Sequence, residues 1–386
     1  MRIAFKTFGC RLNRAEALDA EAQAEAAGHQ VVALGAAGAP DVIVVRGCSV
    51  TAKAQRDCER EIARLRRRFP AAEVRLAGCL PAAPAARRPA EGPIPLRTSR
   101  AYLKVQDGCS GRCAFCIVPR FRGPPVSVPF ADVLARARAF LGAGYRELVI
   151  TGCNLALYRS AGLGLPGLLA ALAELPGAPH RVRLGSLEPG ICDDALLDAV
   201  AAHPNICRFL HLSLQSGSSR VLRRMGRPYA AEDVSAFCAR AVRRLGPRLA
   251  LGADVIAGFP GETDEDHAAT QVFLAGPHAR FARLHVFPYS ERPGTPAAEM
   301  DGALPRAVRR ARARELAALG RRQRTTFAQS FVGQEVEVCV ERGGARGWTA
   351  EYLPCRLAAP APRRALVSVR VAACGADGTL QAAYGP

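Results

Sequence analysis

Six apolar segments between residues 101 and 287, each followed by polar or glycine-rich residues, constrain the fold more than any other feature of this sequence. Strands that alternate with helices form parallel sheets, whose chemistry gathers at the carboxyl ends of the strands. We therefore expect an α/β protein with a partial (β/α)6 barrel and a trailing basic helix over residues 99–328. The six segments are AYLKVQD (101–107), ELVIT (147–151), RVRLGS (181–186), FLHLSL (209–214), LGADVIA (251–257) and ARLHVF (282–287).

The first 82 residues repeat this strand–loop–helix pattern on a smaller scale. Three strand-like segments each run into a Gly-Cys pair, and these pairs contain Cys10, Cys48 and Cys79. Because parallel strands end at the same edge of a sheet, we expect the three cysteines to converge although they lie far apart in the sequence. The pattern predicts an N-terminal parallel α/β domain over residues 1–82 that carries a metal triad.

The remaining segments differ in composition. Residues 83–98 are rich in Ala, Pro and Arg without periodicity, and we interpret them as a linker. From residue 329 to residue 386, stretches such as EVEVCVE and ALVSVRVAAC alternate between apolar and polar residues. Alternation with a period of two is typical of half-buried strands, so a small C-terminal β-barrel is expected.

Composition also bears on the compartment and the partner. No run approaches the ~20 apolar residues that a membrane-spanning helix needs, and the start, MRIAFKTFGC, does not resemble a signal peptide. We interpret the chain as cytoplasmic, where its 14 cysteines are not expected to form a disulfide framework. The formal charge of +19 favours a polyanionic partner, nucleic acid first. A composition biased toward arginine explains this charge equally well.

Three further cysteines lie close together in the loop CSGRCAFC, at the spacing C-x3-C-x2-C. A structural zinc site takes four protein ligands, whereas Cys109, Cys113 and Cys116 are only three. A [4Fe–4S] cluster ordinarily takes four thiolates, so three would leave one iron open to an outside ligand. The spacing by itself leaves zinc or coincidence as alternatives.

With Phe115 just before its last cysteine, this loop resembles the signature of radical S-adenosylmethionine (SAM) enzymes. The resemblance extends over essentially the whole chain to the methylthiotransferases. It implies a cluster domain, a barrel and a C-terminal TRAM β-barrel, with an auxiliary [4Fe–4S] cluster on Cys10, Cys48 and Cys79 and a radical [4Fe–4S] cluster in the CSGRCAFC loop. The motifs that carry it, in family order, are GCRLNRAEA, CSVTAKAQRDCE, AGCL, DGCSGRCAFCIVPRFRG, LHLSLQSGSSRVLRRMGRPY, ADVIAGFPGETDED and LHVFPYSERPGTPA.

The resemblance implies an enzyme that converts a C–H bond into C–S–CH3, with SAM as both radical source and methyl donor. An aromatic C–H is too inert for acid–base chemistry, so the clusters and SAM, rather than a side chain, are expected to carry the reaction. The segments SLEP, LHLSLQSG and LHVFPYSERPGTP resemble most the group that modifies C2 of N6-threonylcarbamoyladenosine beside the tRNA anticodon. Groups that act on isopentenyladenosine in tRNA or on a ribosomal-protein aspartate are the alternatives.

The resemblance further implies the tRNA anticodon loop, an external electron donor and a sulfur source as partners, and we expect a monomer. For most residues of the implied SAM site, an ordinary turn at the end of a strand is the competing interpretation. The motifs place these residues at Phe115, Thr151, Gly152, Ser186, Glu188, Gln215, Ser216, Asp254 and Gly258.

Several other residues fit a structural role. We interpret His211, His285 and Cys153 as residues that line or fill the barrel, and Trp348 and Tyr352 as core of the small C-terminal barrel. The arginines of residues 306–324 fit a solvated helix as well as an RNA contact.

The N-terminal domain departs from the family pattern. Only 29 residues separate Cys79 from Cys109, where the family usually has a longer passage, and Arg46-Gly47 replaces the common Asn-Thr before Cys48. We therefore expect a shortened domain. The second hypothesis is a tRNA-binding iron–sulfur protein that has lost sulfur insertion.

Overall fold

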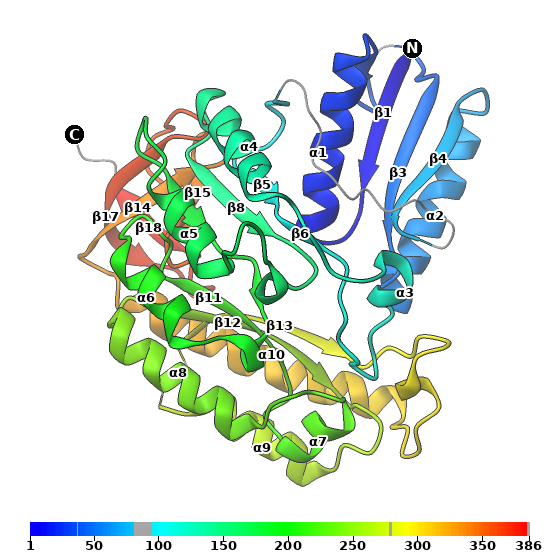
Figure 1. Cartoon of the computed structure of the whole chain (residues 1–386). Coiled ribbons are helices and arrows are strands. Elements are labelled where there is room, and N and C mark those ends of the chain that lie inside the picture. The colour runs from blue at the N-terminus through cyan, green and yellow to red at the C-terminus, as the bar shows by residue number, and fades with distance from the viewer. Residues whose placement is uncertain (37, 81–93, 278–279, 384–386) are drawn as a thin grey trace.

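A computed structural model describes residues 1–36, 38–80, 94–277 and 280–383 of the chain. The N-terminal sheet and the C-terminal barrel flank a larger central α/β region (Figure 1). The linker predicted at residues 83–98 lies mostly outside the described residues. Among the described helices, none combines the length and the apolar character needed to cross a membrane.

The N-terminal sheet is parallel, as predicted, and has four strands. Their order is β2 (Gln30–Val32), β1 (Arg2–Thr7), β3 (Val42–Cys48) and β4 (Glu73–Cys79). Helix α1 (Arg11–Ala26) follows β1 and lies between this sheet and the central region in Figure 1. Helix α2 (Ala52–Arg68) follows β3, and the Thr51 side chain caps it by accepting a hydrogen bond from the Ala54 amide (3.1 Å).

Parallel strands in two sheets build the central region. One sheet has the order β5 (Ala101–Lys104), β8 (Glu147–Thr151), β9 (Arg181–Arg183). The other has the order β10 (Ser186–Leu187), β11 (Phe209–Gln215), β12 (Ala250–Ala257), β13 (Phe281–Pro288). The third predicted strand is therefore broken between β9 and β10. Gly185 lies at this break, where a Cβ atom would be only 2.7 Å from the Ile150 carbonyl oxygen.

Helices cover the outer face of these sheets, which confirms the predicted β/α alternation. Apolar side chains of strands and helices interlock in one large core that includes Leu148, Leu168, Leu212 and Leu251. Burial of such side chains supplies the main driving force for this packing. The helices are α4 (Phe130–Gly142), α5 (Leu165–Ala173), α6 (Asp194–Ala202), α7 (Ser219–Arg224), α8 (Ala231–Leu245), α9 (Asp264–Ala275) and α10 (Arg306–Gln329).

Short elements complete the loop after β5. Strand β6 (Gln106–Asp107) pairs with β7 (Val126–Ser127), and helix α3 (Val118–Arg122) lies between them in the sequence. The CSGRCAFC loop is therefore held at both ends, by β6 before Cys109 and by α3 after Cys116.

The C-terminal strands close into a small barrel, as predicted from their alternation. The order is β14 (Glu335–Val340), β15 (Arg346–Thr349), β16 (Pro354–Leu357), β18 (Leu380–Ala383), β17 (Leu366–Cys374). Alternate residues of β17 are buried, and Val367, Val369 and Val371 fill the barrel. Closure leaves no long free edge.

Candidate functional site

Cys10, Cys48 and Cys79 converge at the carboxyl edge of the N-terminal sheet. Cys48 and Cys79 are register neighbours on β3 and β4. Gly9, just before Cys10, has a left-handed φ of 93°, and a Cβ atom there would lie 2.9 Å from the Cys48 Cβ. Burial, together with the neighbouring cysteines, raises the pKa of Cys79 to about 11 although Arg122 opposes this shift. The structure thus brings together the triad predicted from the sequence.

Arg122 connects this triad to the loop that carries the other three cysteines. Its Nε donates to the Cys79 Sγ (3.1 Å), and its Nη1 donates to the Glu16 carboxylate (2.6 Å). Arg122 is the last residue of α3, which begins two residues after Cys116. Arg46 and Lys104 also pair with Glu16, at 2.8 Å each. A charged network that is almost fully buried therefore fixes the N-terminal sheet against the barrel.

Asn13 belongs to the same network and does not cap α1, whose N-cap is Cys10. Its amide nitrogen donates to the Phe8 and Gly47 carbonyls (2.8 Å each), and its oxygen accepts from Arg122 Nη2 (2.9 Å). Asn13 therefore links the ends of β1 and β3 to Arg122. Sequence reasoning missed Glu16, because a carboxylate inside a helix carries no local signal of burial.

Cys109, Cys113 and Cys116 lie in a compact loop. A Cβ atom on Gly111 would be 3.3 Å from the Cys109 Sγ and 3.6 Å from the Cys113 Sγ, so these two sulfurs flank one glycine. The Ala114 amide donates to the Met225 carbonyl (2.9 Å), which clamps the loop against the end of α7. Burial raises the pKa of Cys116 to about 12.

The number of thiols in each set suits a cluster better than a structural zinc ion. A structural zinc ion takes four protein ligands, whereas each set offers three cysteines. Two sets of three thiols therefore fit the [4Fe–4S] groups predicted from the sequence, with one iron open to an outside ligand.

Arg227 is a functional candidate that sequence reasoning missed. Its Nη1 donates to the Cys113 Sγ (3.0 Å), its Nε donates to the Tyr229 hydroxyl (2.8 Å), and it forms an ion pair with Glu188. Burial raises the pKa of Cys113, while the positive charge of Arg227 acts against that shift and favours the thiolate. Arg227 lies inside the motif RRMGRPY, so its place in that motif was the available signal.

The structure places several of the predicted SAM residues at or after the ends of the barrel strands. Glu188 reaches the CSGRCAFC loop through Arg227, and the Phe115 ring meets Phe259 edge to face (6.5 Å between centroids). Thr151 ends β8, and Gly152 packs so tightly on Gln106 that a Cβ would lie 3.0 Å from the Gln106 carbonyl oxygen.

The other predicted residues lie farther along the sheet. Gln215 ends β11 with a left-handed φ of 69°, and the buried Ser216 hydroxyl lies 3.3 Å from the Thr270 hydroxyl. Ser186 is exposed at the start of β10. Asp254 lies within β12 and contacts the imidazoles of His211 and His285. The contact of all these predicted residues with SAM stays a prediction.

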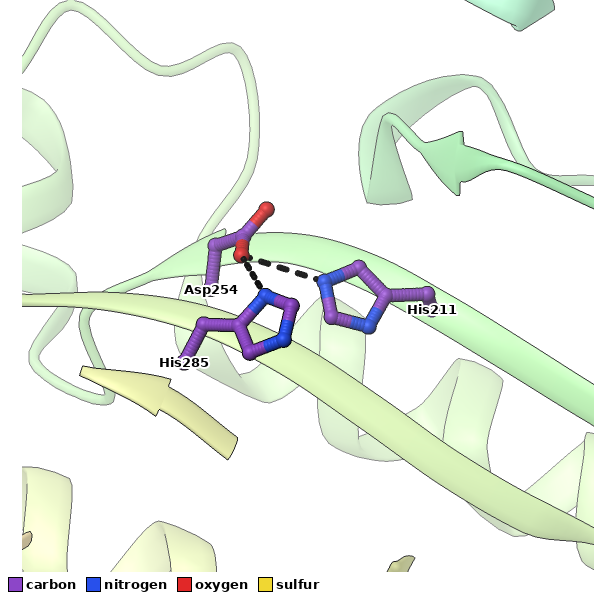
Figure 2. Close-up of side chains that lie close together, drawn as sticks. All are labelled: His211, Asp254 and His285. Carbon is purple, nitrogen blue, oxygen red and sulfur yellow. Dashed lines mark hydrogen bonds and ion pairs between the residues drawn. The ribbon is translucent and has the colours of Figure 1, made fainter. Parts of the chain in front are cut away.

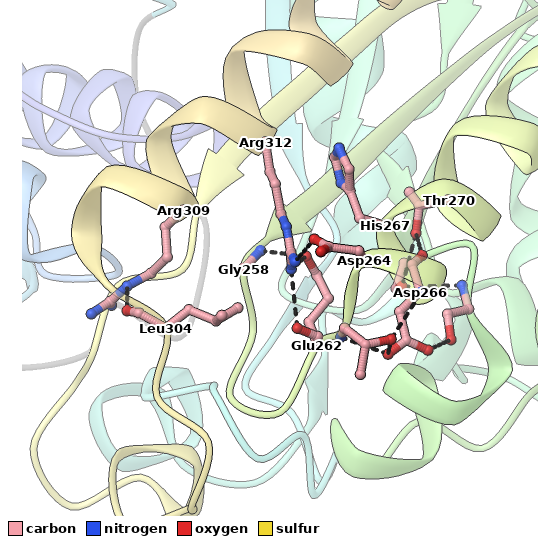
Figure 3. A network of polar contacts seen from close by, with 12 residues as sticks. Gly258, Glu262, Asp264, Asp266, His267, Thr270, Leu304, Arg309 and Arg312 are labelled. Atoms are coloured by element: carbon pink, nitrogen blue, oxygen red, sulfur yellow. Dashed lines mark hydrogen bonds and ion pairs between the residues drawn. The ribbon is translucent and has the colours of Figure 1, made fainter.

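Gly258 lies in the loop after β12, and helix α10 fixes this loop (Figure 3). The Gly258 amide donates to the Glu262 carboxylate (3.0 Å), which also accepts from Arg312 Nη1 (2.7 Å). Arg309 donates to the Leu304 carbonyl (2.8 Å) and packs against Gly258. Two arginines of the basic helix therefore have a structural role, which the sequence left open.

Cys153, interpreted as a lining residue, contacts neither triad by hydrogen bond. Its Sγ donates to Asp107 Oδ1 (3.4 Å), and burial raises its pKa further above the ordinary thiol value. A thiol that donates in this way is protonated, unlike a metal ligand.

Comparison with known proteins gives the family. Residues 103–274 match the radical SAM superfamily, and residues 2–93 match the uncharacterized protein family UPF0004. The tRNA-2-methylthio-N(6)-dimethylallyladenosine synthase of Sphingopyxis alaskensis (strain DSM 13593 / LMG 18877 / RB2256) is 33% identical, over 88% of this chain and 87% of that protein. The chain belongs to the radical SAM methylthiotransferase family. This assignment confirms the predicted enzyme class and the [4Fe–4S] and SAM cofactors.

Another member of this methylthiotransferase family is similar over a shorter range. The threonylcarbamoyladenosine tRNA methylthiotransferase MtaB of Treponema pallidum (strain Nichols) is 40% identical over 66% of this chain, and the match spans 52% of that relative. The chain thus spans about half the length of this relative. The cobalamin- and [4Fe–4S]-bound radical SAM methyltransferase TsrM of Kitasatospora setae shares the fold, with a TM-score of 0.55, 16% identity and 77% coverage of both chains.

Proposed function

We propose that this protein is a tRNA methylthiotransferase that attaches a methylthio group to C2 of N6-threonylcarbamoyladenosine beside the anticodon. In this proposal Cys109, Cys113 and Cys116 hold the radical [4Fe–4S] cluster, and the triad of the N-terminal sheet holds the auxiliary one. When bound, these clusters and SAM supply the radical, the sulfur and the methyl group. The enzyme then acts on cytoplasmic tRNA as a monomer, with an external electron donor and sulfur source.

The link that Arg122 makes between the two cysteine triads is the main support for the proposal. It donates to Cys79 in one cysteine triad, while its own helix continues directly from the other. The buried pairs with Glu16 hold both triads in a fixed relation, which a reaction between two clusters requires. A protein that only bound RNA would have no need to fix two thiol triads against each other.

The chain's own residues would position and shield the reacting groups. Arg227 would favour the charged form of Cys113 and hold Glu188 at the edge of the barrel. Phe115, Phe259 and Tyr289 pack together on one side of the loop, and such a cluster of rings excludes water. No side chain is assigned as an acid or a base.

The choice of adenosine rests on two supports. The segments LHLSLQSG and LHVFPYSERPGTP resemble the threonylcarbamoyladenosine group, and the relative from Treponema pallidum is named for that substrate. The relative that matches over most of its length is named instead for dimethylallyladenosine. Both names specify a modified adenosine in tRNA, and the charge of +19 suits such a polyanion.

Nucleoside mass spectrometry tests this proposal. The chain is expressed in a host that lacks its own methylthiotransferases, and the bulk tRNA is digested. We expect 2-methylthio-N6-threonylcarbamoyladenosine, and none from a Cys113→Ala variant. Methylthiolated isopentenyladenosine would contradict the choice of substrate. No new nucleoside from protein loaded with both clusters would favour the second hypothesis, an RNA-binding iron–sulfur protein without sulfur insertion.

A further inference from the structure

Three side chains on neighbouring strands of the barrel form a compact polar cluster (Figure 2). Asp254 Oδ1 lies 3.1 Å from His211 Nε2 and 3.1 Å from His285 Nδ1. The three residues come from β11, β12 and β13, and one ligand atom from each lies within 4.8 Å of the others. Such a set resembles a site for a metal ion, so its surroundings decide what it can bind.

The surroundings favour an anion over a metal ion. Arg283 Nε donates to His285 Nε2 (2.7 Å), so the second ring nitrogen of His285 is already engaged and the cluster orients a guanidinium. Burial lowers the pKa of His211, and the positive charge of Arg11 acts in the same direction, while Asp254 opposes this shift. A divalent cation would enter a region that already holds two arginines, which electrostatic repulsion opposes.

Arg283 and His285 face away from the helix that covers β13. Leu284, between them, packs against Gly320 of α10, where a Cβ atom would lie 2.8 Å from Leu284 Cδ1. Because side chains alternate along a strand, Arg283, His285 and Phe287 point to the other face of the sheet. On that face 36% of the His285 side chain and 41% of Phe287 are exposed, so a ligand can reach it.

Arg11 approaches the same place from the N-terminal domain. Its Nη1 donates to the Leu184 carbonyl (3.3 Å) at the break in the barrel. The guanidinium carbons of Arg11 and Arg283 lie 5.3 Å and 4.8 Å from the centre of the Tyr352 ring. Arg11 also directly follows Cys10, so this location adjoins the N-terminal cysteine triad.

These two arginines differ from their neighbours in having no ion-pair partner within the described parts of the chain. Nearby, Arg181 and Arg183 pair with Glu147 (2.6 and 2.7 Å), and Arg100 pairs with Glu341 (3.0 Å). Burial lowers the pKa of Arg283, and the charges of Arg11 and Arg100 lower it further, although Tyr352 opposes this shift. Two partly buried cations that lack a carboxylate partner favour the binding of an external carboxylate.

Threonylcarbamoyladenosine and dimethylallyladenosine differ in whether they carry a carboxylate. A threonylcarbamoyl substituent ends in a carboxylate, whereas a dimethylallyl substituent is a hydrocarbon. We propose that Arg11 and Arg283, the latter oriented by His285 and Asp254, bind the carboxylate of the threonylcarbamoyl group and so determine which adenosine is accepted. This inference rests on the proposed function and assigns it a specificity site.

A purely structural role is the competing explanation, because both guanidiniums also stack on Tyr352 of the C-terminal barrel. That role predicts a loss of stability on substitution without any effect on the choice between RNAs. The specificity role predicts a loss of preference among RNAs that differ only in one carboxylate. The two explanations therefore separate in a binding measurement.

The test uses the full chain with both clusters and three synthetic anticodon stem-loops at one fixed salt concentration, since phosphate contacts dominate affinity. One stem-loop carries threonylcarbamoyladenosine, one its methyl ester and one unmodified adenosine. We expect the free acid to bind at least about tenfold more tightly than the ester, because hydrogen bonds to a charged group are strong. Arg283→Gln should abolish this difference and leave the affinity for unmodified RNA within about twofold. Arg283→Lys should retain part of it.

The matched control is Arg240→Gln, since Arg240 lies on α8 in an exposed pair with Asp194 and should leave the preference unchanged. Equal binding of acid and ester by the wild-type protein would overturn the inference. So would an unchanged preference in a folded Arg283→Gln variant. If threonylcarbamoyladenosine is nevertheless methylthiolated in cells, the proposed function stands and only this inference fails. If a fourth stem-loop, which carries isopentenyladenosine, binds more tightly than these three, both fail.

Discussion

At the scale of single residues, three arginines alter the ionisation of the Tyr352 hydroxyl. Burial opposes its ionisation, but Arg11, Arg100 and Arg283 outweigh burial and lower its pKa to about 7. An unfolded tyrosine titrates near pH 10, so the folded state binds fewer protons between these values. This contribution to stability is full above pH 10, decreases as the pH falls, and is lost below about pH 7.

Tyr352→Phe should therefore remove a pH dependence rather than a constant amount of stability. Between pH 7 and pH 9 the wild-type protein should gain stability over the variant by up to about 1.4 kcal/mol per pH unit. Urea unfolding of both proteins at pH 6.5, 8 and 9 measures this difference. Parallel curves would mean that Tyr352 stays protonated among the arginines.

At the scale of elements, the loop after β12 depends on its contact with α10. Gly258 has a φ of 73°, and a Cβ atom there would lie 2.5 Å from Arg309 Cγ and 2.9 Å from Arg309 Cα. Gly258→Ala should therefore strain the backbone and push α10 away, at a combined cost of about 2–4 kcal/mol. Gly246→Ala is the matched control, since Gly246 has a φ of 80° with nothing within 4 Å of the added Cβ. It should cost only about 1–2 kcal/mol in urea unfolding.

At the scale of the whole molecule, three domains meet through arginines. Arg122 connects the N-terminal sheet to the barrel, and Arg181 donates to the Trp348 carbonyl (2.6 Å) in the C-terminal barrel. Trp348 and Tyr352 stack at 4.7 Å between centroids, and Tyr352 packs on Phe209 of the central region. Trp348 and Tyr352 fill core, as predicted, but this core lies where the C-terminal barrel joins the central region.

The two cysteine triads belong to different domains, so they should load independently. After anaerobic reconstitution the wild-type protein should contain about eight iron atoms, and Cys79→Ala about four. Cys79→Ala should still cleave SAM, because the CSGRCAFC loop keeps its contacts with Met225 and Arg227. Cys113→Ala should show the reverse, with iron retained in the N-terminal domain and no cleavage. Loss of all iron from Cys79→Ala would show that the domains depend on each other.

Local patterns in the sequence were sufficient for the strands and for the cysteines. The alternation of apolar strands with helices predicted the parallel strands of the N-terminal sheet and of the central region, since burial on two faces demands apolar strands. The position of Cys10, Cys48 and Cys79 after three strands predicted their convergence because parallel strands share one edge. Period-two alternation likewise predicted the C-terminal barrel. The break between β9 and β10 was missed, because it depends on how close Gly185 comes to Ile150.

The sequence by itself determined the elements, the two cysteine triads and the family, because each depends on spacing along the chain. Only the tertiary structure decided the partners of the charged residues. More than a hundred residues separate the members of each of three neighbouring pairs: Glu16 and Arg122, Arg227 and Cys113, and Arg11 and Arg283. The two imidazoles that contact Asp254 come from other strands. The strength of such electrostatic contacts depends on distance and burial, and both are set only when the domains pack together.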